Sequence, residues 1–193
     1  MMRETLLKRL GVLLMVILVL MTGVVTGTVR ADQTDSKLDG LFRQLRAASE
    51  PSAAQQAEAS IWQIWVHNGD PEVDRRMAIG ILSINHGQLN RSLASFDKIV
   101  DMAPNFAEGW NKRATVHYLM GNYDASVNDI QKTLALEPRH FGALSGMGLI
   151  FDAVGNDAAA VRVWERALEV HPHMQGIVPR LKELKRELTG KPT

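Results

Sequence analysis

Glycine and proline recur at a fixed interval of 34 residues through the second half of this 193-residue chain. The recurring residues are Gly87, Gly121 and Gly155, and Pro104, Pro138 and Pro172. A unit of this length is too short to bury an apolar core alone, so neighbouring units must stack on one another. The interval predicts three contiguous units at 73–106, 107–140 and 141–174.

Each unit carries small residues at its eighth and twentieth places and large apolar residues at its twenty-fourth and twenty-eighth. In unit order these are Gly80, Ala114 and Gly148; Ser92, Ser126 and Ala160; Phe96, Ile130 and Trp164; and Val100, Leu134 and Leu168. Small side chains let two helices approach closely. The repeated glycine can end a first helix because it adopts positive φ without a Cβ clash, and the repeated proline stops a second helix. Each unit is therefore predicted to be a helical hairpin.

These positions resemble the tetratricopeptide repeat (TPR) family, and residues 107–138 carry the strongest match through Trp110, Gly121, Tyr123 and Pro138. The resemblance implies an all-α fold, a right-handed α-solenoid of antiparallel helical hairpins. It also implies a concave groove that binds a protein or peptide, with no enzymatic activity. Within the family, the chain resembles small exported proteins of alphaproteobacterial type.

Two arginines depart from the family pattern. Arg76 and Arg113 stand at places that usually hold large apolar residues. A buried guanidinium without a partner is costly, so each side chain must reach either a carboxylate or the solvent. We favour a packed stem with its charged head in water.

Helices also flank the three units. Residues 37–68 are predicted to form a degenerate N-terminal helical hairpin, and its Trp62 and Trp65 are expected to pack against the first full repeat rather than to contact a ligand. Residues 175–188 carry one apolar stripe among charged residues, which is typical of a capping helix. Residues 189–193 are expected to be a disordered tail.

The first 31 residues have the features of a signal peptide. Lys8 and Arg9 precede a run of about 12 apolar residues, and Val29 and Ala31 provide small side chains before a cleavage point at Asp32. We therefore expect export to the periplasm. The alternative is an uncleaved anchor in the inner membrane with the domain facing the periplasm, which would be the chain's one contact with a membrane.

Charge and composition exclude several functions. Residues 1–31 hold four of the 22 basic residues but one of the 21 acidic residues, which leaves 18 against 20 in the remainder. Such a surface gives no basis for binding nucleic acid. The chain has no cysteine, no zinc-binding His-Glu-x-x-His and no phosphate-binding glycine loop, so we expect neither a metal nor a cofactor. The pair His171 and His173 falls on a predicted turn and is interpreted as structural.

The TPR resemblance assigns the groove to the first helix of each unit. The expected peptide-binding residues are Met77, Ile81, Ile84, Glu108, Asn111, Lys112, Thr115, Tyr118, Ser145, Leu149 and Asp152, and the same register adds Leu119 and Gly142. Family members that grip the carboxylate tails of heat-shock chaperones use several basic residues and asparagines at these places. Here Asn111 and Lys112 alone belong to that set, which disfavours the same ligand.

The preferred hypothesis is a non-enzymatic protein–protein interaction scaffold of the bacterial cell envelope. The alternative is a structural envelope-integrity factor, tethered to the inner membrane or self-associating as a homo-oligomer, with Trp62, Trp65 and the helix at 177–188 as its contact surfaces. The glycines Gly142, Gly146 and Gly148 are attributed to close helix packing or to a bare groove floor rather than to phosphate binding.

Overall fold

The computed structural model describes residues 32–190, and this range contains helices and no strand. The helices are α2 (Leu38–Ala47), α3 (Pro51–Trp65), α4 (Pro71–Asn85), α5 (Leu89–Met102), α6 (Ala107–Leu119), α7 (Tyr123–Leu136), α8 (Phe141–Ala153), α9 (Asp157–Val170) and α10 (Val178–Leu188). The all-α prediction is confirmed. The signal segment predicted at 1–31 and residues 191–193 of the predicted tail lie outside the described residues.

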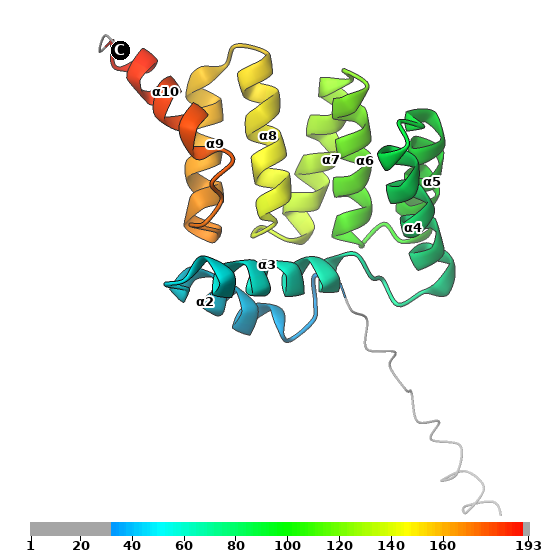
Figure 1. Cartoon of the computed structure of the whole chain (residues 1–193). Coiled ribbons are helices and arrows are strands. Elements are labelled where there is room, and N and C mark those ends of the chain that lie inside the picture. The colour runs from blue at the N-terminus through cyan, green and yellow to red at the C-terminus, as the bar shows by residue number, and fades with distance from the viewer. Residues whose placement is uncertain (1–31, 191–193) are drawn as a thin grey trace, which may run out of the picture.

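The helices α4 to α9 stand side by side as three antiparallel hairpins (Figure 1). The turn inside each hairpin contains one of the repeated glycines, and each adopts a positive φ: 69° at Gly87, 77° at Gly121 and 73° at Gly155. A side chain with a Cβ is strained in this conformation. The glycines therefore end the first helices as the sequence predicts.

The eighth and twenty-fourth places of each unit are complementary in size. A Cβ added to Gly80 would lie 2.5 Å from the Phe96 ring, and one added to Gly148 would lie 2.2 Å from the Trp164 indole. The second unit has Ala114 at the eighth place, and its partner is the smaller Ile130. An aromatic ring at one place thus requires glycine at the other, because protein interiors are close-packed.

In the first two units, the serine at the twentieth place also forms a hydrogen bond to the first helix of its hairpin. Ser92 donates its hydroxyl to the carbonyl of Gly80 at 2.9 Å, and Ser126 donates to that of Ala114 at 2.8 Å. Both serines are fully buried. This bond satisfies a buried hydroxyl while holding the two helices at close range.

The N-terminal hairpin α2–α3 does not stack on the first repeat. It lies across the ends of the repeat helices (Figure 1). Trp65 is buried and stacks on His140 with ring centroids 4.1 Å apart, and Phe42 lies edge-on to Phe141 at 6.5 Å. The prediction that Trp62 and Trp65 pack against the first repeat is wrong: their partners belong to the turn before α8 and to its first residue.

The segment 32–65 touches the turn that follows each of the three repeats. Gln33 bonds Asn105 O at 2.5 Å and accepts from Ala107 N at 3.2 Å in the first of these turns. Trp65 stacks on the ring of His140 in the second. In the third, His171 Nε2 lies 3.2 Å from a Glu58 carboxylate oxygen. The hairpin therefore ties the three repeats together along one edge.

The last helix, α10, covers the open side of the third repeat. Ile177, Leu181 and Leu184 are buried against a cluster that includes Trp164, whereas Leu188 is exposed. Arg180 reaches back and pairs with Asp152 of α8 at 2.9 Å. These contacts bury the apolar face of α10 against the third repeat.

Both unusual arginines pair with carboxylates. Arg113 makes two bonds of 2.7 Å to Asp129 and one of 3.0 Å to Asp97, which joins α6 to α7 and α5. Arg76 lies 2.6 Å from a Glu72 oxygen in its own helix. The favoured interpretation, a guanidinium head in water, is wrong for Arg113, whereas the side chain of Arg76 stays 30% exposed beside a partly exposed Glu72. Asp129 is nearly fully buried, and its charge is compensated by the two-pronged bond from Arg113.

Among residues 32–190 we find no helix with the length and apolar character needed to cross a bilayer.

Candidate functional site

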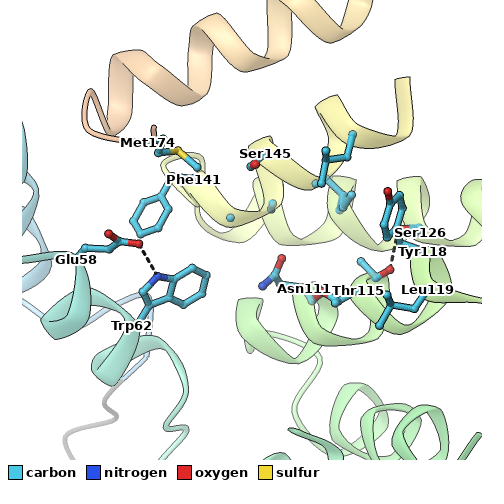
Figure 2. A pocket seen from close by; sticks show the side chains of 16 residues that line it. Glu58, Trp62, Asn111, Thr115, Tyr118, Leu119, Ser126, Phe141, Ser145 and Met174 are labelled. Atoms are coloured by element: carbon cyan, nitrogen blue, oxygen red, sulfur yellow. Dashed lines mark hydrogen bonds between the residues drawn. The ribbon is translucent and has the colours of Figure 1, made fainter. Parts of the chain in front are cut away.

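A cavity of about 370 Å³ opens between α6 and α8 (Figure 2). Both are first helices of their units, and two second-helix residues, Ser126 and Ile130, complete its floor. Its further lining residues come from α3, α6, α8 and the turn before α10. They are Glu58, Trp62, Asn111, Ala114, Thr115, Tyr118, Leu119, Phe141, Gly142, Ala143, Ser145, Gly146, Leu149 and Met174.

Five of the predicted groove residues line this cavity together. They are Asn111, Thr115, Tyr118, Ser145 and Leu149. Leu119 and Gly142, which the same register placed in the groove, line it too. The structure therefore brings together the predicted residues of the second and third units.

Two predicted groove residues are buried instead. Met77 is 2% exposed because it packs in the cluster formed by Phe96, Phe106 and Val73. Glu108 is 1% exposed because His140 and the start of α8 cover it. Their assignment to the groove surface was wrong. The repeat register predicts which way a side chain points, but it does not predict which other residues cover that side chain.

Four other predicted residues lie outside the cavity lining. Ile81 and Ile84 of α4 pack against the cluster around Phe96. Asp152 is engaged by Arg180 of α10, as described above. Lys112 places its ammonium 3.1 Å from Glu108 Oε1 and 5.3 Å from the centre of the Trp62 ring. The first unit thus contributes nothing to the cavity.

One wall of the cavity comes from α3, which sequence reasoning missed. Trp62 lies over the start of α8, where a Cβ on Gly142 would be 2.6 Å from the indole edge. Its ring also meets Phe141 edge-on at 5.2 Å. The indole N–H donates to Glu58 at 3.4 Å, which holds both side chains on the cavity wall (Figure 2). The sequence feature that could have indicated this wall is Gly142, because a residue without a side chain leaves room for the Trp62 ring.

A buried polar network lies behind α6. The His140 Nδ1 accepts from the backbone N–H of Ala143 at 3.1 Å, so the ring proton is on Nε2, which donates to Glu108 at 2.9 Å. Burial raises the pKa of Glu108, but the Lys112 charge and the His140 hydrogen bond outweigh it and place the pKa below its usual range. Glu108 is therefore an ionised acceptor.

This network fixes the orientation of Asn111. Its amide nitrogen donates to Glu108 Oε2 at 2.8 Å, and a carboxylate can accept but not donate. The amide oxygen consequently points the other way, toward α8 across the cavity (Figure 2). Asn111 is only 6% exposed, and no group among residues 32–190 donates to that oxygen.

The carboxylate of Glu58 stands at the edge of the cavity. His171 accepts at Nδ1 from the backbone N–H of His173 at 3.3 Å, which leaves Nε2–H to face Glu58. Burial lowers the pKa of His171 against the opposing effect of Glu58. The imidazole is thus neutral at neutral pH, and in the described part of the chain no lysine or arginine pairs with Glu58.

In the same range, no group of three or more His, Cys, Asp or Glu side chains is placed to hold a metal ion.

Comparison with known proteins finds relatives in sequence and neighbours in fold. A TPR repeat-containing protein of Rhizobium etli is 35% identical over 157 residues, which cover 81% of this chain and 77% of that protein. No family model matches the chain. The first TPR domain of Spaghetti, solved with an HSP90 peptide, gives a TM-score of 0.59 at 19% identity and covers 61% of this chain and 94% of its own.

A structure of MamA gives a TM-score of 0.57 at 19% identity, covering 72% of this chain and 78% of that one. At these identities the structural neighbours are similar in fold alone.

Proposed function

Because the chain belongs to the tetratricopeptide repeat family, we propose that it is a non-catalytic binding module that holds a segment of another protein in the cavity between α6 and α8. The observation that carries this proposal is the cavity itself, with Leu119 and Leu149 exposed at 48% and 40% beside aromatic walls. Exposed apolar side chains around a hollow of this kind mark binding sites on soluble proteins.

The form of the cavity favours a short segment. Its walls are Trp62, Phe141 and Tyr118, while Gly142 and Gly146 leave part of α8 without side chains. Large apolar side chains of a partner can enter such a space, and the few polar groups at its edge can orient the partner's backbone. The volume of about 370 Å³ suits a few side chains rather than a whole folded domain.

The alternative role, a structural envelope factor, receives less support. Two of its three expected contact surfaces are occupied within the chain, since Trp65 is buried in the hairpin contact and Leu181 and Leu184 of α10 are buried against the third repeat. Trp62 faces the cavity, which is consistent with ligand binding.

The place of action that we propose is the periplasm, and it rests on the N-terminal 31 residues. Fusion of residues 1–40 to alkaline phosphatase, which folds only after export, tests it. Activity in whole cells is the expected result. Mass measurement of the exported protein then separates cleavage before Asp32 from an intact anchor.

Groove binding is tested with a photo-cross-linking amino acid at Leu149, compared with the same amino acid at Leu82. Leu82 is 57% exposed on α4, away from the cavity, and is thus a matched control. In cells that express the chain, adducts with another protein should form from position 149 and not from position 82. Equal adducts from both positions, or none from 149, would contradict binding in this cavity.

A further inference from the structure

Two polar groups at the cavity present only acceptor oxygens to it, whereas the hydroxyls of Tyr118 and Ser145 can donate as well as accept. The amide oxygen of Asn111 points into the cavity because Glu108 takes the amide nitrogen. Glu58 contributes a carboxylate on the α3 wall. Neither of these oxygens can form a hydrogen bond to a ligand carboxylate, because both partners would be acceptors.

Lys112, a cation beside the Trp62 wall of the cavity, is already engaged. Lys112 lies 3.1 Å from Glu108 Oε1 and sits over the Trp62 ring, so its charge is balanced by a buried carboxylate. If Lys112 moved toward an acidic ligand, the buried carboxylate of Glu108 would lose its ion pair, which is costly. The site therefore differs from one built to hold a negatively charged tail.

The cavity walls beside these acceptors are apolar. Trp62, Phe141 and Met174 surround the position of Glu58 (Figure 2). A long basic side chain fits such surroundings, since its methylene stem packs on aromatic and thioether groups while its head donates to oxygens. Arginine offers five donors and can satisfy more than one acceptor at once.

We propose that the cavity selects a peptide segment in which an arginine or lysine adjoins a bulky apolar residue. The basic head bonds Glu58 and the Asn111 oxygen, and the apolar neighbour packs against Tyr118 and Leu149. This inference rests on the proposed function and adds the chemistry of the ligand to it.

The test uses three sets of octapeptides on the immobilised full chain. All carry a central Leu-Phe pair and blocked termini, which removes terminal charges, and they differ in having arginine, glutamine or glutamate on both sides of that pair. Retained peptides are quantified by mass spectrometry. The arginine set should be retained about tenfold more than the glutamate set, as expected for hydrogen bonds to charged groups.

Two variants locate the preference. Glu58→Gln should reduce the arginine-to-glutamate ratio to near one while the glutamine set is still retained. Glu50→Gln alters an exposed glutamate at the start of the same helix that makes no capping bond, and it should leave the ratio unchanged. If Glu58→Gln folds poorly, the arginine-to-glutamate retention ratio of the wild-type chain still tests the proposal.

The outcomes separate the two proposals. Equal retention of all three sets, or preference for glutamate, overturns the selection of basic segments and leaves groove binding standing. Retention of none of the three sets contradicts both proposals. An unchanged ratio in Glu58→Gln removes Glu58 from the site.

Discussion

The imidazole of His140 stacks on the indole of Trp65, with ring centroids 4.1 Å apart and planes within 10° of parallel. One residue ends the N-terminal hairpin and the other caps the start of α8, so the contact joins segments separated by 75 positions. His140 also donates to Glu108 of the second repeat. A single imidazole thus connects the hairpin, the second repeat and the third.

Replacing Trp65 tests the strength of this connection. Trp65→Ala should lower the free energy of unfolding by about 3–5 kcal/mol, the cost of removing a fully buried aromatic side chain. Urea unfolding followed by far-ultraviolet circular dichroism measures it. His67→Ala, two residues along at an exposed position, should change the free energy by less than about 0.5 kcal/mol. A small effect at Trp65 would mean that the hairpin is not docked.

Two glycines of α8 should respond in opposite ways to alanine. Gly148→Ala places a Cβ 2.2 Å from the indole nitrogen of Trp164, which is buried and donates to Ser145 O at 3.1 Å. We expect destabilisation of about 1–3 kcal/mol from overpacking. Gly146→Ala meets its nearest neighbour at an ordinary 3.8 Å and should stabilise the helix by about 0.5–1 kcal/mol.

Thermal unfolding of the two glycine variants under one set of conditions compares them directly. Equal effects of the two substitutions would argue against the size match between the eighth and twenty-fourth places.

Arg113 should be important for stability although it lies at a place that the family fills with apolar residues. Arg113→Ala leaves the buried Asp129 without its two-pronged partner, and we expect a loss of about 3–5 kcal/mol. Arg75→Ala removes an exposed pair with Glu72 and should cost about 0–1 kcal/mol. Chemical denaturation of both variants provides the comparison, and similar losses would contradict a special role for Arg113.

The buried carboxylate of Glu108 should make stability depend on acid pH. Its pKa is lower in the folded chain than its ordinary value of 4.5, so below pH 4.5 the unfolded chain binds more protons at this site. The stabilisation from Glu108 is therefore complete above that pH and is lost as pH falls through the folded-state pKa. Glu108→Gln should be less stable at pH 7 and should show a shallower decline below pH 4.5 in urea titrations. Parallel pH profiles of wild type and variant would exclude this contribution.

Local spacing predicted the three repeats because their contacts are local. Gly87, Gly121 and Gly155 mark turns that depend on backbone conformation alone. The small residues Gly80 and Gly148 face ring partners within their own units. Such short-range pairs repeat with the sequence period, so a single sequence was enough to find them.

The position of the hairpin could not be obtained in this way. Extending the register backwards placed Trp62 against the first repeat, whereas its contacts are Gly142 and Phe141 of the third. No periodic pattern encodes the docking of one element across the ends of others. Because the hairpin supplies Glu58 and Trp62 to the cavity, part of the site chemistry depended on that unpredicted contact.

The most direct test of the hairpin position is a cross-link between two introduced cysteines, which is unambiguous because the chain has none. Asp39 of α2 pairs with Arg139 of the turn before α8 at 2.6 Å. A hairpin stacked on the first repeat would instead place α2 beside α4, the helix that carries Arg75. With a short bismaleimide, the pair Asp39→Cys and Arg139→Cys should cross-link within the monomer in high yield, and the pair Asp39→Cys and Arg75→Cys should not. Efficient linkage of the second pair, with none of the first, would contradict a hairpin that lies across the repeats and forms a wall of the cavity.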